Sequence, residues 1–144
     1  VRLQAVPPPF VNVLIDTSVW SLALRRSRPH EEPETAELAE LIREGRAGIL
    51  GLIRQELLSG VRDPGQFETL KTHLRAFPDI QLESEDHEEA ARFFNRCRAR
   101  GVQGSTIDFL ICAVAARRGL PILTTDGDFA RYARVLPLKL HRPR

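Results

Sequence analysis

Three short apolar runs, each followed by a segment with helical character, constrain the fold of this chain most strongly. Residues 11–15 (VNVLI), 47–52 (AGILGL) and 121–125 (PILTT) are short and almost uniformly apolar, which is typical of buried strands. Strands that alternate with helices form a largely parallel sheet with helices on both faces. The sequence therefore predicts an α/β fold.

Helical periodicity and turn residues place the other elements. Helices are predicted over residues 17–26, 34–45, 53–60, 66–77, 84–101, 105–119 and 126–135. A weak strand is expected at 79–83 and an edge strand at 135–140. The helix over 84–101 has acids in its first turn and arginines in its last, as the helix dipole favours, with Ser84 as the expected N-cap.

Length and composition are typical of one globular domain. The chain has 144 residues, of which 42% are hydrophobic and 28% charged, and this length is enough to bury a core. We expect an irregular, proline-rich lead-in at 1–10, one domain at 11–140 and a short tail at 141–144. No apolar stretch reaches the roughly 20 residues that cross a bilayer, and the first residues lack the apolar centre of a secretory signal. We therefore expect a cytoplasmic protein with no membrane partner.

Four acidic residues lie directly beside apolar segments: Asp16, Glu56, Asp108 and Asp126. A carboxylate next to a core-forming segment costs free energy unless it finds a partner. Four such residues suggest one shared partner, and a divalent cation is the natural candidate because it takes oxygen ligands. The pattern therefore favours metal-dependent phosphodiester chemistry.

The predicted elements place most of these acids at one edge of the sheet. Asp16 and Asp126 directly follow predicted strands, and Glu56 lies in the helix after another strand. In open α/β sheets, ligands bind in the crevice outside the carboxyl ends of the strands. Asp108 lies in the first turn of a helix, so it can join the other acids only if the start of that helix lies at the same edge of the sheet.

Each acid also has a purely structural explanation. Ser105 and Asp108 have the spacing of a capping box. Asp16 and Asp126 could cap the helices that follow their strands, and Glu56 could be a solvated helix residue. Because caps are common, no single acid is diagnostic, and the hypothesis depends on the four acids taken together.

The charge balance is compatible with a polyanionic substrate. The chain has 21 basic and 19 acidic residues, a net charge of +2; without the four acids the balance is 21 to 15, or +6. A basic surface around an acidic pocket suits nucleic acid. Arginines within 92–100 and 115–119 are candidates for phosphate contacts.

Four segments, taken in order, form a recognisable set: LIDTSVW (14–20), ELLSGVRD (56–63), GSTIDFLICAVAARRGLPILTTDGDF (104–129) and RVLPLKL (134–140). This ordered set resembles the PIN-domain family, and more narrowly the ribonuclease toxins of VapBC-type toxin–antitoxin pairs. The resemblance covers residues 11–140. It implies a parallel sheet of four or five strands with flanking helices.

The resemblance also implies a set of site residues and their cofactor. The catalytic and metal-binding acids it implies are Asp16, Glu56, Asp108 and Asp126, with Asp128 as an additional or substitute metal ligand. The cofactor would be one or two Mg²⁺ or Mn²⁺ ions. The acids are flanked by four hydroxyl residues, Thr17, Ser18, Thr124 and Thr125. A hydroxyl there, in the first place that of Thr17 or Thr124, could orient a ligating carboxylate or a water, although turn preference explains these residues equally well.

The activity implied by the resemblance is endoribonucleolytic cleavage, with hydrolysis of the RNA phosphodiester bond by metal-activated water. The implied assembly is a homodimer inhibited by a small cognate antitoxin protein. One rival is a phosphatase with Asp16 as nucleophile, but the second aspartate that this chemistry needs is replaced by Ser18. The other rival is a non-catalytic PIN-like module that binds RNA or protein.

Overall fold

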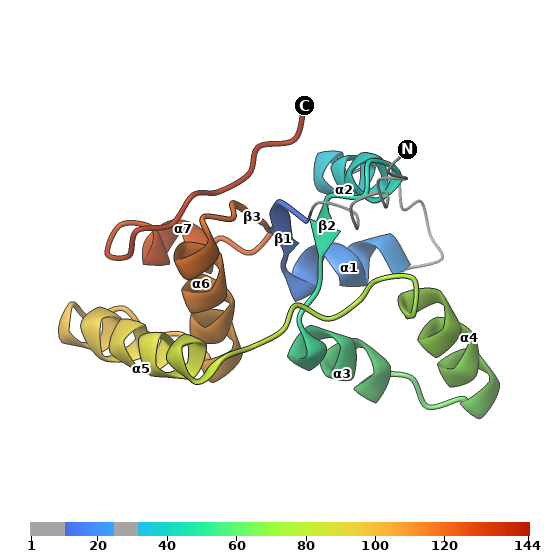
Figure 1. The fold of residues 1–144 in the computed structure, drawn as a ribbon, viewed down its shortest axis with the longest axis horizontal. Helices are drawn as coiled ribbons and strands as arrows, with labels where there is room; N and C mark the ends of the chain where they lie inside the picture. Colours follow the sequence, from blue (N-terminus) through green and yellow to red (C-terminus); the bar gives the residue numbers. More distant parts are fainter. Residues whose placement is uncertain (1–10, 25–31) are drawn as a thin grey trace, which may run out of the picture.

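The computed structural model describes residues 11–24 and 32–144. The lead-in predicted at 1–10 and the last two residues of the helix predicted over 17–26 lie outside these ranges. In chain order the described elements are β1 (Val13–Ile15), α1 (Thr17–Leu24), α2 (Pro33–Arg43), β2 (Ala47–Gly48), α3 (Gly51–Ser59), α4 (Pro64–Leu74), α5 (Ser84–Ala99), α6 (Thr106–Arg118), β3 (Ile122–Leu123) and α7 (Asp128–Tyr132) (Figure 1). None of the described helices is both long and apolar enough to cross a membrane.

The strands form a parallel sheet in the order β2–β1–β3. In the central strand β1, Leu14 pairs with Gly48 on one side and with Ile122 on the other. All three residues of β1 are fully buried, as expected for a parallel strand covered on both faces. The α/β class with a parallel sheet and flanking helices is confirmed.

Single parallel bridges extend the sheet at both edges. Asp79 pairs with Ile49 beyond β2, and Leu140 pairs with Ile122 beyond β3. These bridges fall where the weak strand at 79–83 and the edge strand at 135–140 were predicted, but in the described residues neither segment pairs over more than one position. The sheet thus has three strands and two bridged edge segments, in place of four or five full strands.

Helices cover the sheet from two sides. In the view of Figure 1, α5, α6 and α7 lie to the left of the strands and α1 to α4 to the right. Seven consecutive residues of α6, Phe109–Ala115, are buried, so this helix is enclosed on nearly all its faces. The first turn of α6 carries Asp108, and the enclosure of the helix fixes the position of that residue.

Asp86 ties the start of α5 to the end of α6. Its carboxylate is fully buried and accepts hydrogen bonds from Arg117 (2.6 Å) and Arg118 (2.6 and 2.9 Å), as well as from the backbone of Glu83 (2.8 Å). The two guanidinium groups hold the pKa of Asp86 well below its usual range, against the effect of burial. The contact also shows that α5 and α6 are antiparallel.

This network corrects two sequence predictions. The N-cap of α5 is Glu83 and Ser84 is the first helical residue, because the Asp86 carboxylate reaches back to the Glu83 backbone. Arg117 and Arg118 are engaged by Asp86 at the C-terminal end of α6. Asp108 lies about 15 Å away along the helix, so these arginines are not candidates for phosphate contacts at the acids.

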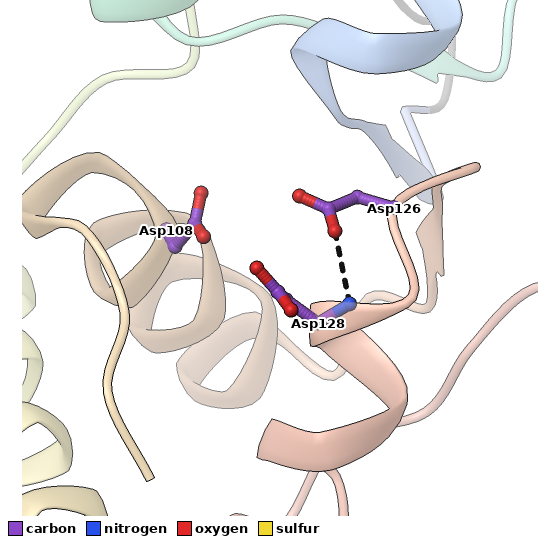
Figure 2. A group of neighbouring side chains, drawn as sticks. All are labelled: Asp108, Asp126 and Asp128. Atoms are coloured by element: carbon purple, nitrogen blue, oxygen red, sulfur yellow. Dashed lines mark hydrogen bonds between the residues drawn. The ribbon is translucent and has the colours of Figure 1, made fainter.

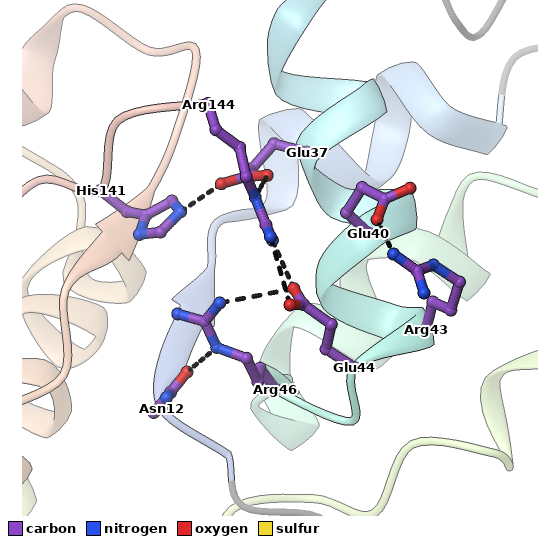
Figure 3. Close-up of polar contacts among 8 residues, drawn as sticks. All are labelled: Asn12, Glu37, Glu40, Arg43, Glu44, Arg46, His141 and Arg144. Carbon is purple, nitrogen blue, oxygen red and sulfur yellow. Dashed lines mark hydrogen bonds and ion pairs between the residues drawn. The ribbon is translucent and has the colours of Figure 1, made fainter.

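The last residues of the chain contact α2. Glu37, which is 4% exposed, accepts hydrogen bonds or ion pairs from His141 (2.6 Å) and Arg144 (2.9 Å), and Arg144 also pairs with Glu44 (Figure 3). The backbone at Lys139 and His141 pairs with Ile122 of β3. The segment predicted as a tail at 141–144 therefore joins the edge of the sheet to α2.

Asp86→Asn is expected to lower the free energy of unfolding by ~3–5 kcal/mol, because it leaves two guanidinium groups without their buried partner. Chemical denaturation measures this loss. Asp63→Asn is the matched control, since Asp63 is an exposed N-cap of α4 and asparagine caps a helix equally well. A loss no larger than that of the control would contradict the role assigned to Asp86.

The stability difference between the wild type and Asp86→Asn should depend on pH. A carboxyl whose pKa is lowered by folding contributes stability above its ordinary value, 3.8, and loses that contribution as the pH falls toward the lowered pKa. The wild type should therefore lose more stability than Asp86→Asn between about pH 4 and pH 2. Equal slopes for the two proteins would contradict this.

Candidate metal-binding site

Four aspartates lie at the carboxyl edge of the sheet. Asp16 directly follows β1, Asp126 follows β3, and Asp128 begins α7. The first turn of α6 supplies Asp108. Figure 2 shows the carboxylates of Asp108, Asp126 and Asp128 facing one another across the space between α6 and the loop after β3.

Hydroxyl groups hold the carboxylate of Asp16. This residue is 4% exposed, and its Oδ2 atom accepts hydrogen bonds from Ser18 Oγ (2.7 Å) and Thr124 Oγ1 (2.8 Å), with the Ser18 amide at 3.4 Å. Thr124 Oγ1 in turn accepts from the amide of Asp126 (2.9 Å). Thr124 therefore connects the ends of β1 and β3.

A residue of α7 holds the carboxylate of Asp108. Its Oδ2 atom accepts a hydrogen bond of 2.7 Å from the hydroxyl of Tyr132. The Tyr132 ring is fully buried and packs against Phe109 and Phe129, with ring centroids 5.1 and 5.2 Å apart. Because the aromatic packing fixes the ring, the hydroxyl fixes one oxygen of Asp108.

Asp126 and Asp128 are linked through the start of α7. Asp126 Oδ1 accepts a hydrogen bond from the backbone amide of Asp128 at 2.9 Å. Asp128 Oδ1 contacts Arg131 at 3.3 Å, and both side chains are about half exposed. This short link brings the second acid of the TDGDF segment to the same place as the first.

Asp108, Asp126 and Asp128 can each offer one carboxylate oxygen such that the three oxygens lie within 4.8 Å of one another. The Tyr132 hydroxyl donates to Oδ2 of Asp108, and the Asp128 amide donates to Oδ1 of Asp126. A set of carboxylate oxygens suits a hard divalent cation such as Mg²⁺ or Mn²⁺. The residues present therefore fit a metal site.

The electrostatics of the pocket also favour a bound cation. Burial raises the pKa of Asp108, and the charges of Asp16 and Asp126 add to this, while the hydrogen bond from Tyr132 opposes it. The pKa of Tyr132 is raised by burial and by the Asp108 carboxylate, so the phenol stays a hydrogen-bond donor at neutral pH. Carboxylates this close destabilise one another unless a cation compensates them.

Glu56 does not lie within the three-acid group. It is an exposed residue of α3, and its Oε2 atom accepts a hydrogen bond of 3.2 Å from Thr17 Oγ1. Thr17 follows Asp16 directly, so Glu56 borders the pocket on the side of α1. The structure thus brings together Asp108, Asp126 and Asp128, joins Asp16 to them through Thr124, and leaves Glu56 and Thr17 at the margin.

The capping alternatives for the acids are only partly realised. Ser105 caps α6 through Oγ, which accepts from the Asp108 amide at 3.0 Å. The Asp108 carboxylate, however, bonds to Tyr132 and, within the described ranges, does not return to the backbone of Ser105 as a capping box requires. Asp108 is therefore oriented toward the other acids.

Sequence reasoning misses two residues of the site, Tyr132 and Gly104. Ser18, by contrast, flanks Asp16 in the sequence as a candidate to orient a carboxylate, and in the structure its hydroxyl donates to Asp16. Tyr132 reads as an ordinary helix residue. A Cβ atom at Gly104 would lie 2.4 Å from the Tyr132 hydroxyl oxygen, so only glycine leaves room for that hydroxyl. The spacing of Asp128 and Tyr132, four residues apart on one helix face, is the available signal.

Fold and site together define an α/β protein with a cluster of carboxylates at the carboxyl edge of a parallel sheet. Comparison with known proteins agrees. The family model of the PIN domain matches residues 13–135. Ribonuclease VapC11 of Mycobacterium tuberculosis is 30% identical to this chain in an alignment of 131 positions that covers 88% of this chain and 96% of the relative. The chain belongs to the PIN-domain family.

Solved structures have the same fold. FitAcB from Neisseria gonorrhoeae matches with a TM-score of 0.72 at 21% identity, over 91% of this chain and 97% of that one. VapBC-5 from Mycobacterium tuberculosis, a member of the VapBC family of toxin–antitoxin systems, matches with a TM-score of 0.64 at 20% identity, over 90% and 97%. At these identities the likeness confirms the fold alone.

Asp108→Asn is expected to stabilise the metal-free protein at neutral pH. A carboxyl whose pKa is raised by folding makes the folded state less stable as the pH rises above its ordinary value, 3.8. Asparagine removes that charge and can still accept from Tyr132. In EDTA at pH 7 we expect the melting temperature to rise by roughly 2–4 °C, about the shift that 1 kcal/mol produces in a domain of this size.

The exposed cap variant Asp63→Asn is the control for this melting experiment and should show no such rise. A melting temperature of Asp108→Asn below that of the wild type in EDTA would mean that Asp108 is a stabilising structural acid and not a strained member of a metal site.

Proposed function

We propose that this protein is a metal-dependent endoribonuclease and the toxin component of a type II toxin–antitoxin system. The observation that carries the proposal is the convergence of three aspartates from α6, α7 and the loop after β3, with one oxygen of each within 4.8 Å of the others. Membership of the PIN-domain family and likeness to a curated ribonuclease support it.

The cofactor in this proposal is Mg²⁺ or Mn²⁺, one or two ions. Asp108, Asp126 and Asp128 would hold it, with Asp16 beside them and Glu56 at the margin. When held by these residues, a divalent cation would supply compensation of the phosphate charge and activation of water for hydrolysis.

The chain's own residues prepare the pocket for this reaction. Ser18 and Thr124 fix the Asp16 carboxylate by donating to a single oxygen, and no donor from the described parts of the chain is recorded on the other oxygen. Burial of Asp16 limits the screening of its charge by water. The acids are therefore positioned before substrate arrives.

Arginines on α5 are suited to bind the RNA backbone. Arg96, Arg98 and Arg100 are exposed at the C-terminal end of α5, and the first two lie over the rings of Phe93 and Phe94 at 5.5 and 5.4 Å. Because α5 and α6 are antiparallel, this end of α5 lies toward the start of α6, where Asp108 is found. Exposed guanidinium groups there can contact phosphates that flank the bond to be cut.

The proposed assembly is a homodimer that a small cognate antitoxin inhibits. One solved structure with this fold belongs to a VapBC toxin–antitoxin system. We infer the same kind of partner for this chain from its family membership and fold. Copurification with the product of a neighbouring small reading frame would test the partner, and light scattering of the purified protein would test the dimer.

Cleavage of total RNA by purified, antitoxin-free protein tests the activity. We expect discrete fragments with Mn²⁺ or Mg²⁺, none in EDTA, and a rate at least about 100-fold lower for Asp16→Asn and Asp108→Asn, more than the loss typical of outer-shell residues. Circular dichroism checks that the variants are folded, and Asp63→Asn is the control.

Two results would change the proposal. A variant that cuts at the wild-type rate would remove that aspartate from the site. RNA that is retained but never cut, by folded protein with any metal, would indicate a non-catalytic binding module.

Glu56→Gln tests whether Glu56 is a metal ligand. Because Glu56 is exposed and outside the three-acid group, we expect this variant to bind Mn²⁺ within about threefold of the wild type, well short of the roughly 10-fold loss that marks an outer-shell residue. Isothermal titration calorimetry measures the affinity. A loss as large as that of Asp108→Asn would make Glu56 a metal ligand equal to the aspartates.

A further inference from the structure

We propose that Tyr132 is a positioning residue for the metal site, which holds Asp108 in its ligating orientation through one hydrogen bond, and that Gly104 is present to allow this bond. The proposal rests on the proposed function and concerns the residues that prepare the same pocket. It starts from the 2.7 Å contact between the Tyr132 hydroxyl and Asp108 Oδ2.

The hydroxyl group has little freedom to do anything else. Tyr132 is fully buried, and its ring packs between Phe109 of α6 and Phe129 of α7. A ring held by two aromatic neighbours directs its hydroxyl to one point, and at that point lies one oxygen of Asp108. The bond is of the charge-assisted kind, since a phenol donates to a carboxylate.

The hydrogen bond joins α6 and α7, two of the elements that form the site. Asp108 lies in the first turn of α6, whereas Asp128 begins α7 and lies one helical turn before Tyr132. Without a cation, repulsion between these carboxylates favours rotation of Asp108 away from the group. The Tyr132 hydroxyl opposes that rotation by holding Oδ2 of Asp108.

Gly104 provides independent support. A Cβ atom at this position would lie 2.4 Å from the hydroxyl oxygen, 2.7 Å from Cζ and 2.9 Å from Cε1 of Tyr132. All three distances are too short for real contacts, so any side chain at 104 displaces the ring end that carries the hydroxyl. The loop before α6 is thus fitted closely to the end of the tyrosine that makes the hydrogen bond.

Tyr132→Phe removes only the hydroxyl and keeps the aromatic packing. We expect its affinity for Mn²⁺, measured by isothermal titration calorimetry, to fall by about 10- to 100-fold, the range found when an outer-shell partner of a metal ligand is removed. Gly104→Ala should lower the affinity as well, although the hydroxyl is still present. If both act through one bond, the double variant should bind no more weakly than the weaker single variant.

Thr35→Val is the matched control. Thr35 is 3% exposed, and its hydroxyl donates to the carbonyl of Glu32 at 2.8 Å, away from the acids. This variant also loses one buried hydroxyl bond, so any general effect on stability should be shared with Tyr132→Phe. Only Tyr132→Phe should lose affinity for Mn²⁺.

The outcomes separate this inference from the proposed function. Wild-type affinity for Mn²⁺ in Tyr132→Phe, with unchanged cleavage, would overturn the role of Tyr132 and leave the ribonuclease intact. Wild-type protein that binds Mn²⁺ but cuts no RNA would overturn the activity, while the calorimetry still decides the role of Tyr132. A wild type that binds no Mn²⁺ would overturn both.

Discussion

The carboxylate of Asp16 is buried at the end of the central strand, and the residues around it are arranged to accept a negative charge there. Two hydroxyl groups, one from the start of α1 and one from the end of β3, donate to a single oxygen of this residue. One of these hydroxyls, from Thr124, also accepts the amide of Asp126. The same bonds that satisfy the buried carboxylate therefore fix the strand ends and the loop that carries the other acids.

Repulsion among the neighbouring carboxylates is a second constraint, and it opposes the burial of charge at this edge of the sheet. Three more aspartates converge beside Asp16, and their mutual repulsion costs stability in the absence of a cation. The protein holds them in place by rigid means: an enclosed α6, a buried tyrosine, and a helix hairpin locked at its far end by Asp86 and two arginines. A pocket that is destabilising when empty and held in position is well suited to bind a metal ion.

Most of the fold follows from patterns within single segments. The buried strands, the helices and the positions of Asp16, Asp108 and Asp126 could be predicted because apolar runs, caps and turns act locally. The contact of Asp108 with Tyr132 and the pairing of Asp86 with its two arginines could not, because they depend on contacts between segments: Tyr132 lies 24 residues from Asp108, and Asp86 lies 31 and 32 residues from its arginines. The extent of the edge segments, whose pairing is limited to single bridges, could not be defined from their weak apolar pattern either.

The most direct test of the metal site is a crystal structure of the protein soaked in Mn²⁺, with the ion located by anomalous scattering. We predict manganese bound by the carboxylates of Asp108, Asp126 and Asp128, with Tyr132 still bonded to Asp108. Manganese at another place, or none at the aspartates at millimolar concentration, would contradict this prediction and favour a structural role for the acids.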